Sequence, residues 1–237
     1  MTVVRYATLR PVVTKLLRYY GQPARPVSSD PFHLVLWEQV AYLVPDAQRR
    51  RAFTALRRET GLRPARILGA SSQRLEEITR LGGAIAARTR AARLRESAEL
   101  VIGRWDGDLR GALRLPLAQS RRALAEFPMI GEPGADKILA FTKRARLVPL
   151  DSNALRVVTR LGLTTPAKDY RSSYRRAQQA LAQAMPRAAG WPILAYGLLR
   201  QHGQELCRRS APLCDRCPLR ARCPSAAMFS KGGRNHE

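Results

Sequence analysis

The chain has 237 residues, with 42 Lys and Arg against 18 Asp and Glu, which gives a formal net charge of +24. This excess of cations points to a polyanionic partner, of which DNA or RNA is the natural one. No apolar run approaches the roughly 18 to 20 residues of a membrane span, and segment 1–13 lacks the apolar core of a signal peptide, so we expect a cytoplasmic protein with reduced thiols and no membrane partner.

Helical apolar spacing recurs along the chain, and turn residues separate segments of helix length. Strand-like alternation is almost absent. The hydrophobic fraction of 45% is sufficient to build a core for one large domain or two small ones. The sequence therefore predicts an all-α fold, with helices over 11–20, 32–44, 46–59, 72–80, 84–102, 117–127 and 135–144.

Glu38 stands in the middle of an apolar helix. Asp30 and Pro31 have the chemistry of an N-cap and a first helical residue. Segment 32–44 is apolar on nearly all sides, which predicts a central, buried helix. Glu38 has no cation one helical turn away in the sequence, and burial of such a carboxylate is unfavourable unless it has a task. Glu38 is therefore a candidate functional residue.

A tight turn that contains glycine joins two predicted helices at 127–134. The turn reads Phe-Pro-Met-Ile-Gly-Glu-Pro-Gly, and the next helix is expected to begin at Ala135. This pattern is typical of a helix-hairpin-helix, in which glycine lets backbone N–H groups approach a DNA phosphate and the helix dipole adds attraction. An ordinary pair of antiparallel helices explains the stretch equally well. The candidate DNA-binding residues here are Ile130, Gly131 and Gly134.

A further helix start follows in the segment Leu-Asp-Ser-Asn-Ala-Leu-Arg-Val, which begins at Leu150. Asp151 occupies the position of an N-cap, and a capping role alone would explain its presence. Catalysis is the alternative role for this carboxylate. Asn153 and Arg156, which follow it in the same segment, are candidate DNA-binding residues.

All four cysteines lie in one short segment with the spacing C-x6-C-x2-C-x5-C. Four thiolates in one loop match the ligand set of a [4Fe-4S] cluster. A structural zinc site remains open, although zinc ribbons usually have two C-x2-C pairs. Disulfides are disfavoured in a chain without a secretory signal. The predicted metal ligands are Cys207, Cys214, Cys217 and Cys223.

Taken in order, the Glu38 helix, the hairpin, the Leu-Asp-x-Asn segment and the cysteine loop resemble the iron-sulfur branch of the helix-hairpin-helix DNA glycosylase superfamily. That branch includes endonuclease III and the mismatch-specific adenine and thymine glycosylases. The resemblance covers almost the whole chain and implies a six-helix barrel and a helical domain that holds a [4Fe-4S] cluster. The implied boundaries are 30–147 for the barrel, about 117–145 for its hairpin, and 1–29 with 148–237 for the cluster domain, whose cluster loop is 207–223.

Three features of the resemblance concern the reaction. Pro133 stands where members similar to endonuclease III carry a Lys that attacks the sugar, so the covalent lyase route lacks its nucleophile. The Asp151-x-Asn153 segment is closer to the mismatch glycosylases, and Glu38 lies where the adenine glycosylases place their catalytic acid. The resemblance implies a monofunctional DNA glycosylase that removes a damaged or mispaired base in base excision repair. A lyase that uses Lys137 instead is the weakest alternative.

Hydrolysis of an N-glycosidic bond requires a protonated leaving base and a stabilised cationic sugar. Apolar surroundings are expected to keep Glu38 protonated, as an acid, whereas the helix start is expected to keep Asp151 ionised, beside the sugar. The base must leave the stack, which implies a pocket and a wedge residue. Tyr42, one helical turn after Glu38, is the candidate for the pocket or wedge, and core packing is its alternative.

Some positions depart from the pattern of the superfamily. Met129 replaces a glycine of the hairpin, Glu132 and Pro133 stand where a basic residue is common, and 42–45 lacks the polar residues that members insert near the lesion. These departures motivate a second hypothesis, in which the protein binds lesions or bent DNA without chemistry. In both hypotheses the partner is double-stranded DNA, and we expect a monomer associated with the nucleoid. The sequence does not define which base is removed.

Overall fold

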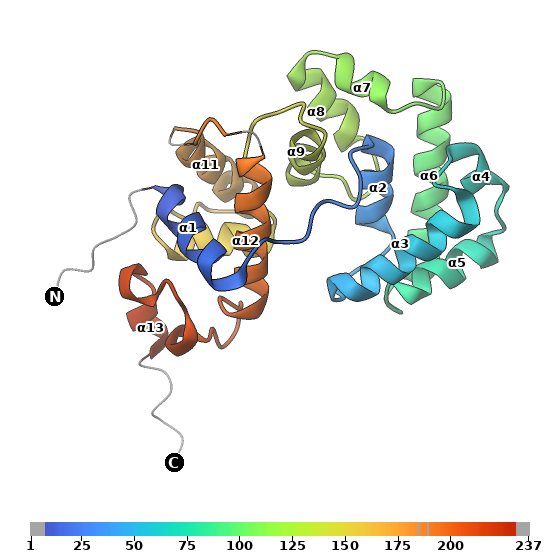
Figure 1. Ribbon diagram of the computed structural model, residues 1–237. Coiled ribbons are helices and arrows are strands. Elements are labelled where there is room, and N and C mark those ends of the chain that lie inside the picture. The colour runs from blue at the N-terminus through green and yellow to red at the C-terminus, as the bar shows by residue number, and fades with distance from the viewer. Residues whose placement is uncertain (1–7, 184, 189, 231–237) are drawn as a thin grey trace. The chain divides into compact units, whose positions relative to one another are not determined.

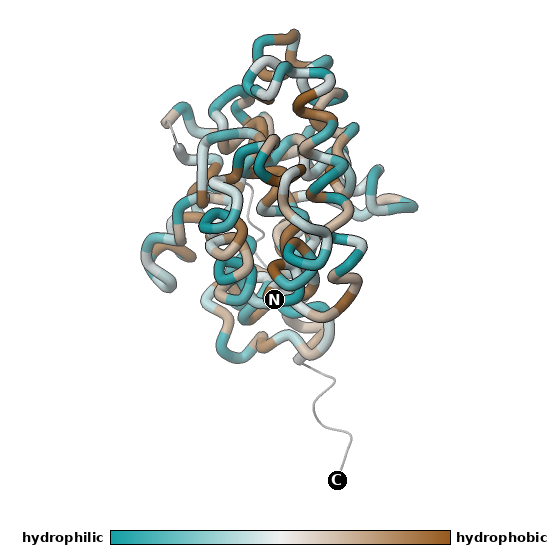
Figure 2. Tube along the Cα trace, turned by 90° about the vertical axis from the view of Figure 1, so that its right-hand side faces the viewer, coloured by the Kyte–Doolittle hydropathy of each residue, from teal (hydrophilic) through white to brown (hydrophobic). Residues whose placement is uncertain are grey.

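The computed structural model describes residues 8–183, 185–188 and 190–230, and across these ranges it contains helices and no strand (Figure 1). The prediction of an all-α fold is therefore confirmed. Hydrophobic and hydrophilic residues alternate in short segments along the trace (Figure 2). Within the described ranges, no helix is long and apolar enough to cross a membrane.

The chain divides into two compact units, which are described separately. The central unit spans Pro26–Ala145, and the terminal unit combines Met1–Arg25 with Arg146–Glu237. The sequence predicts the boundaries at 29/30 and 147/148, a few residues away. The helices of the central unit are α2 (Pro31–Gln39), α3 (Asp46–Thr60), α4 (Pro64–Gly69), α5 (Ser72–Leu81), α6 (Ala87–Trp105), α7 (Arg110–Arg114), α8 (Leu117–Ala125) and α9 (Glu132–Phe141).

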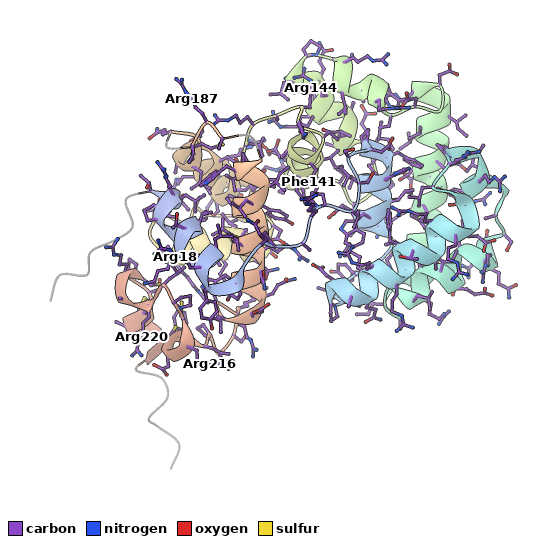
Figure 3. All side chains as sticks on the ribbon, viewed as in Figure 1. Arg18, Phe141, Arg144, Arg187, Arg216 and Arg220 are labelled. Atoms are coloured by element: carbon purple, nitrogen blue, oxygen red, sulfur yellow. The ribbon has the colours of Figure 1, made fainter. Side chains whose placement is uncertain are left out.

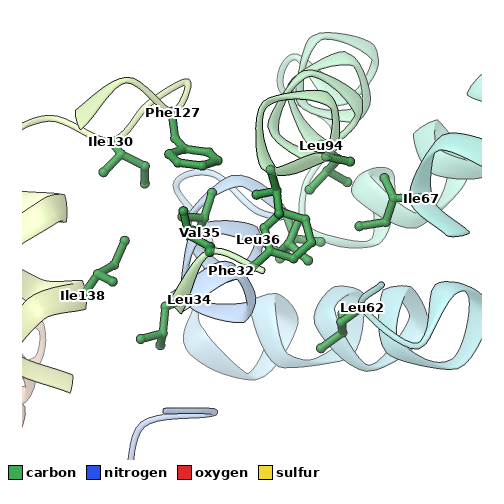
Figure 4. Packing of buried hydrophobic residues seen from close by; sticks show 14 of the residues in the cluster. Phe32, Leu34, Val35, Leu36, Leu62, Ile67, Leu94, Phe127, Ile130 and Ile138 are labelled. Atoms are coloured by element: carbon green, nitrogen blue, oxygen red, sulfur yellow. The ribbon is translucent and has the colours of Figure 1, made fainter. Parts of the chain in front are cut away.

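Helix α2 lies at the centre of this unit, in contact with α3, α6 and α9. Its start follows the sequence prediction, because the Asp30 carboxylate accepts the N–H groups of Phe32 (2.9 Å) and His33 (3.2 Å) and Pro31 needs no hydrogen-bond acceptor in the first turn. Its apolar side chains are buried on several sides. Figure 4 shows this core, with Phe32, Leu34, Val35 and Leu36 of α2, Leu62, Ile67 and Leu94 on one side, and Phe127, Ile130 and Ile138 on the other.

Helix α2 ends at Gln39, five residues before the predicted end at 44, because the guanidinium of a buried arginine forms hydrogen bonds with backbone carbonyls there. The Arg90 guanidinium donates to the carbonyls of Val40 (2.8 Å) and Gly82 (3.1 Å), and also to the carbonyl of Gly83. A Cβ atom on Gly82 would lie 2.3 Å from the Val40 carbonyl oxygen, so this approach requires glycine. The chain then turns through Leu43, whose φ of 51° is left-handed.

The predicted hairpin is present as α8, a tight turn and α9. Helix α9 begins at Glu132, three residues earlier than predicted, with Gly131 as its N-cap. Pro133 therefore lies in the first helical turn, where its missing N–H and fixed φ are tolerated. Two short helices, α4 and α7, are absent from the sequence prediction, because their five or six residues are too few for a periodic pattern.

The terminal unit is built around α12, which packs against α10 and α1. Glycines permit both contacts. A Cβ atom on Gly203 would lie 2.8 Å from the Cβ atom of Asn153, and one on Gly197 would lie 2.8 Å from the ring of Pro23. The helices of this unit are α1 (Leu9–Tyr20), α10 (Ser152–Arg160), α11 (Tyr170–Ala182), α12 (Trp191–Glu205), η1 (Cys214–Arg216), η2 (Arg220–Arg222) and α13 (Ala226–Ser230).

Candidate active site and cluster loop

Asp151 is the N-cap residue of α10, as the sequence predicts. Its Oδ1 atom accepts the backbone N–H groups of Asn153 (3.0 Å) and Ala154 (2.9 Å). These two donors would otherwise lack a partner at the start of the helix. The side chain keeps 25% of its surface exposed, so the carboxylate is both fixed to the backbone and reachable from solvent.

The second oxygen of this carboxylate pairs with a cation from α12. The Nε atom of Arg200 lies 3.0 Å from Asp151 Oδ2, and the Arg200 side chain is 22% exposed. A guanidinium at this distance stabilises the ionised carboxylate. The Tyr170 phenol is close enough to Asp151 to be affected by its charge. Burial, and then the negative charge of Asp151, raise the pKa of Tyr170. Both carboxylate oxygens of Asp151 are therefore engaged by groups of the terminal unit.

Arg156 connects α10 to the cysteine loop. Its guanidinium donates to the carbonyls of Cys207 (2.8 Å) and Gly203 (2.7 Å) and to the side chain of Asn153 (2.8 Å). The sequence assigns Arg156 and Asn153 to DNA binding. The structure gives both side chains internal partners, so their observed role is to brace the cysteine loop against the helix that Asp151 caps, and a DNA contact by either stays a prediction.

The four cysteines surround one pocket, as their spacing predicts. Their side chains are half-buried and form no disulfide, and together they line one pocket. Neighbouring groups approach the sulfurs: His202 Nε2 lies 3.6 Å from Cys217 Sγ, and Arg160 Nη1 lies 3.5 Å from Cys207 Sγ. Burial raises the pKa of the Cys217 thiol to about 11, and the positive charge of a bound metal would favour the thiolate.

This donor set fits a [4Fe-4S] cluster. Four thiols, no carboxylate and a mostly apolar lining match the ligation and the environment that such a cluster requires. In the described part of the chain, no group of three or more His, Cys, Asp or Glu residues is arranged to hold a single metal ion.

Glu38 has a cationic partner, contrary to the sequence expectation. The Nζ atom of Lys137, on α9, lies 2.6 Å from Glu38 Oε2, and the Lys137 and Glu38 side chains are 15% and 21% exposed, respectively. The expectation of purely apolar surroundings is therefore wrong. An ammonium group at hydrogen-bond distance favours the charged carboxylate, whereas the predicted acid role requires the protonated form. The pairing residue is 99 positions away, so no helical spacing within α2 could reveal it.

The hairpin residues assigned to DNA binding have unequal surroundings. Ile130 is 3% exposed, packs in the core and donates its N–H to the Phe127 carbonyl. Gly134 lies inside α9 against the Ile130 side chain. Of these three residues, only Gly131 lies at the start of α9, as its N-cap. Because Ile130 and Gly134 serve packing, the predicted phosphate contact of this hairpin rests on Gly131.

Positive charge extends over both units. Figure 3 labels Arg18, Arg216 and Arg220 on the terminal unit and Arg144 on the central unit. Arg144 is used internally, with its guanidinium bound to the carbonyls of Leu113 and Leu115. Arg18 belongs to an open groove between α1 and the cysteine loop, whose other charged lining residues are Arg10, Lys15 and Arg222.

Comparison with known proteins agrees with this geometry. No protein-family model matches the chain. Endonuclease III of Sulfolobus acidocaldarius is 26% identical over 175 residues, which cover 73% of this chain and 72% of that protein. Endonuclease III of Thermotoga maritima is 22% identical over 213 residues, which cover 89% and 90%. A solved structure of a trapped endonuclease III–DNA covalent intermediate has a TM-score of 0.74 at 18% identity, covering 95% of this chain and 100% of that chain.

The sequence is similar to endonucleases III, and the fold is that of solved helix-hairpin-helix DNA glycosylase structures. The hairpin turn carries Met129 where the superfamily pattern has glycine. Met129 has a φ of 68°, a conformation that glycine adopts without strain and other residues adopt rarely. The backbone thus keeps the shape for which the superfamily uses glycine, although the side chain has changed.

Tyr42 is exposed, so the alternative of core packing is wrong. It keeps 41% of its surface in solvent, and the neighbouring Leu43 keeps 75%. In this turn the Tyr42 N–H donates to the Gly82 carbonyl (3.2 Å). The role of Tyr42 at a base pocket or as a wedge stays a prediction.

The sequence does not predict the ion-pair roles of two site residues, Arg200 and Lys137. Arg200 lies 49 positions after the carboxylate that it binds, on α12, which is not among the helices predicted from the sequence. Lys137 is considered as an amine nucleophile, but its ion pair with Glu38 is not foreseen. The only available signal is that both are single cations in apolar helices, where a charge needs a partner.

Proposed function

We propose that this protein is a monofunctional DNA glycosylase, which hydrolyses the N-glycosidic bond of a damaged or mispaired base in duplex DNA during base excision repair. The observation that carries the proposal is the Asp151 carboxylate, fixed at the start of α10 in a fold of this superfamily. A carboxylate held in place before the reaction stabilises a developing positive charge without having to reorganise. The cationic sugar that forms as the base departs is such a charge.

The surroundings of Lys137 support hydrolysis without a lyase step. A lyase of this superfamily needs an amine that attacks the sugar, and an amine attacks only when it is deprotonated. Pro133 supplies no amine, and the Lys137 amine is held in an ion pair with Glu38 at 2.6 Å. We therefore assign Lys137 to the ion pair and keep a bifunctional glycosylase as the weaker alternative.

We assign the charged Glu38 to the attacking water. A carboxylate paired with Lys137 is a better acceptor than donor of a proton, so it suits the activation of water more than protonation of the base. The acid role expected from the sequence would require a proton on Glu38 despite this partner. The pH dependence of the excision rate separates the two roles. If Glu38 is an acid, the rate falls at pH values above the pKa of its carboxyl group, and if Glu38 is a base, the rate falls at pH values below that pKa.

We propose that Cys207, Cys214, Cys217 and Cys223 bind a [4Fe-4S] cluster. Their common pocket and the arginine contacts to the cysteine loop support a structural role, in which the cluster fixes the loop relative to α10. We expect the purified protein to be brown, with broad visible absorption and about four iron and four sulfide ions per chain. A colourless protein that contains one zinc ion would assign the loop to zinc instead.

Duplex DNA is the proposed partner of a monomeric protein, because the net charge of +24 favours the phosphate backbone. A DNA repair role would place the protein with the chromosome, in the cytoplasm. The test is a single-turnover excision assay on duplexes with adenine opposite 8-oxoguanine, thymine or uracil opposite guanine, and alkylated purines. Strand breaks that appear only after alkali treatment would support a monofunctional glycosylase, and breaks without alkali would favour the lyase.

A non-catalytic DNA-binding protein is the second candidate, and one observation favours it. Both predicted catalytic carboxylates carry an ion-pair partner, Lys137 on Glu38 and Arg200 on Asp151. Each cation lowers the net negative charge that its carboxylate offers to a sugar or a proton. Tight, salt-sensitive binding to lesion-containing duplexes without excision of any base in the panel would favour this alternative and contradict the glycosylase.

A further inference from the structure

His202, on α12, lies between the cysteine loop and the helix α1. Its side chain is 1% exposed, and its Nε2 atom lies 3.6 Å from Cys217 Sγ. Its Nδ1 atom lies 3.0 Å from the hydroxyl oxygen of Tyr20, the last residue of α1. Its backbone carbonyl accepts the N–H groups of Leu206 (3.0 Å) and Cys207 (2.8 Å), where the cysteine loop begins. Both nitrogens of the buried ring therefore face a polar group, and the backbone of the residue is tied to the loop.

The chemistry of a ligating cysteine decides the direction of these two hydrogen bonds. A cysteine that binds a metal is a thiolate and has no proton to donate, so the contact at Cys217 is an N–H···S bond from His202. A neutral imidazole has one N–H group. With that group on Nε2, Nδ1 is an acceptor, and the Tyr20 hydroxyl donates to it. Tyr20 thereby selects the tautomer that directs an N–H group to the sulfur.

We propose that Tyr20 and His202 raise the reduction potential of the cluster through a chain of two hydrogen bonds that ends on the Cys217 thiolate. The inference rests on the proposed [4Fe-4S] cluster and not on the glycosylase activity. Reduction adds negative charge to a cluster and its thiolates, so a hydrogen bond to a thiolate stabilises the reduced form more than the oxidised form. Loss of an electron is then less favourable, which makes the metal centre of the loop more resistant to oxidation.

Arg160 also approaches a cysteine sulfur, but it holds the backbone of the loop at the same time. Its Nη1 atom lies 3.5 Å from Cys207 Sγ and donates to the Arg208 carbonyl at 2.6 Å. A substitution of Arg160 would therefore disturb the loop itself. The Tyr20 hydroxyl, in contrast, acts on Cys217 through one imidazole, and its removal leaves the aromatic ring of residue 20 in place. Tyr20 and His202 are thus positioning residues that can be tested without removal of a backbone contact of the loop.

The test is the reduction potential of the cluster, measured by voltammetry on the purified, iron-loaded protein. We expect His202→Leu to shift the potential to a more negative value, because the N–H donor is lost. His202→Gln should stay close to the unmodified protein, since its amide keeps an N–H group near the position of Nε2. Tyr20→Phe should shift the potential in the same direction as His202→Leu, by a smaller amount. Tyr19→Phe is the matched control, because this neighbouring tyrosine is 48% exposed, and it should leave the potential unchanged.

The double variant Tyr20→Phe/His202→Leu decides whether Tyr20 acts through His202. Its potential should equal that of His202→Leu, and a further shift would overturn the proposal. An unchanged potential in His202→Leu at full iron content would overturn it as well. If His202→Leu loses its iron, the comparison of Tyr20→Phe with Tyr19→Phe decides, and equal potentials in these two variants would contradict the proposal. A colourless unmodified protein would contradict the cluster together with this inference, whereas a brown protein whose potential does not respond to these variants would contradict the inference alone.

Discussion

The two candidate catalytic carboxylates, one in each unit, are held in different ways. Asp151 is tied to the backbone, because its side chain completes the first turn of α10 and also binds Arg200. Glu38 is held through a side chain on another helix, the ammonium of Lys137. Loss of the Asp151 side chain therefore removes a helix cap together with the charge, whereas the Glu38 pair can be altered without loss of a helix cap.

The largest effect is expected when the charge of Asp151 is removed but its cap is kept. Asp151→Asn should lower the single-turnover excision rate on the order of 10³-fold, since a fixed charge beside the sugar is lost. Its melting temperature should stay near that of the unmodified protein. Asp151→Ala should lose the same activity and about 1 kcal/mol of stability as well, because the cap disappears.

Thermal melts and excision assays on both variants test this separation. If Asp151→Asn retained the rate of the unmodified protein, the assignment of Asp151 as the sugar-stabilising carboxylate would be wrong. Equal melting temperatures for the Asn and Ala variants would show instead that the cap contributes little to stability.

An intermediate effect is expected at the Glu38–Lys137 pair. Lys137→Met leaves a mostly buried carboxylate without its cation and should reduce the free energy of unfolding by roughly 1–3 kcal/mol. Glu38→Gln removes the charge on the other side and should also lower the excision rate. The double variant should recover most of the stability but none of the activity.

Denaturant unfolding of the single and double variants forms a double-mutant cycle that measures the pair. Additive losses would mean that the two side chains do not interact in solution, which would remove the basis for assigning Lys137 to an ion pair. Borohydride trapping with Lys137→Met then checks whether any covalent adduct depends on this amine.

The smallest effect on activity is expected from a substitution at Gly203, which would displace the start of α10 and leave the central unit, with Glu38, unchanged. A methyl group at Gly203 meets Asn153 at 2.8 Å, so Gly203→Ala should cost roughly 1–3 kcal/mol of stability. A methyl group at Gly103, on α6, would meet no atom within 4 Å, and Gly103→Ala should stabilise by about 0.5–1 kcal/mol through helix propensity. Melting temperatures that move in the same direction for both would contradict the close packing of α10 and α12.

The sequence predicts most of what is local and little of what is distant. The caps at Asp30 and Asp151, the hairpin and the gathering of the cysteines all follow from signals a few residues long. The partners of Glu38 and Asp151 do not, because Lys137 and Arg200 meet them only after the helices pack.

The early end of α2 has the same cause. Its apolar pattern continues past Gln39, but Arg90, from a helix 50 positions away, takes the Val40 carbonyl. Tyr42, which lies in the turn after this contact, is exposed. Charge in an apolar segment is thus the most informative signal, and also the one whose partner the sequence does not define.

Arg90 also has a consequence for motion. Its guanidinium holds carbonyls from the turn after α2 and from the turn after α5, and a backbone bond from Tyr42 to Gly82 joins the same two turns. Because these bonds join the two turns, displacement of either turn must break hydrogen bonds to the other or to Arg90. We therefore expect the exposed Tyr42–Leu43 segment to move together with Gly82–Gly83.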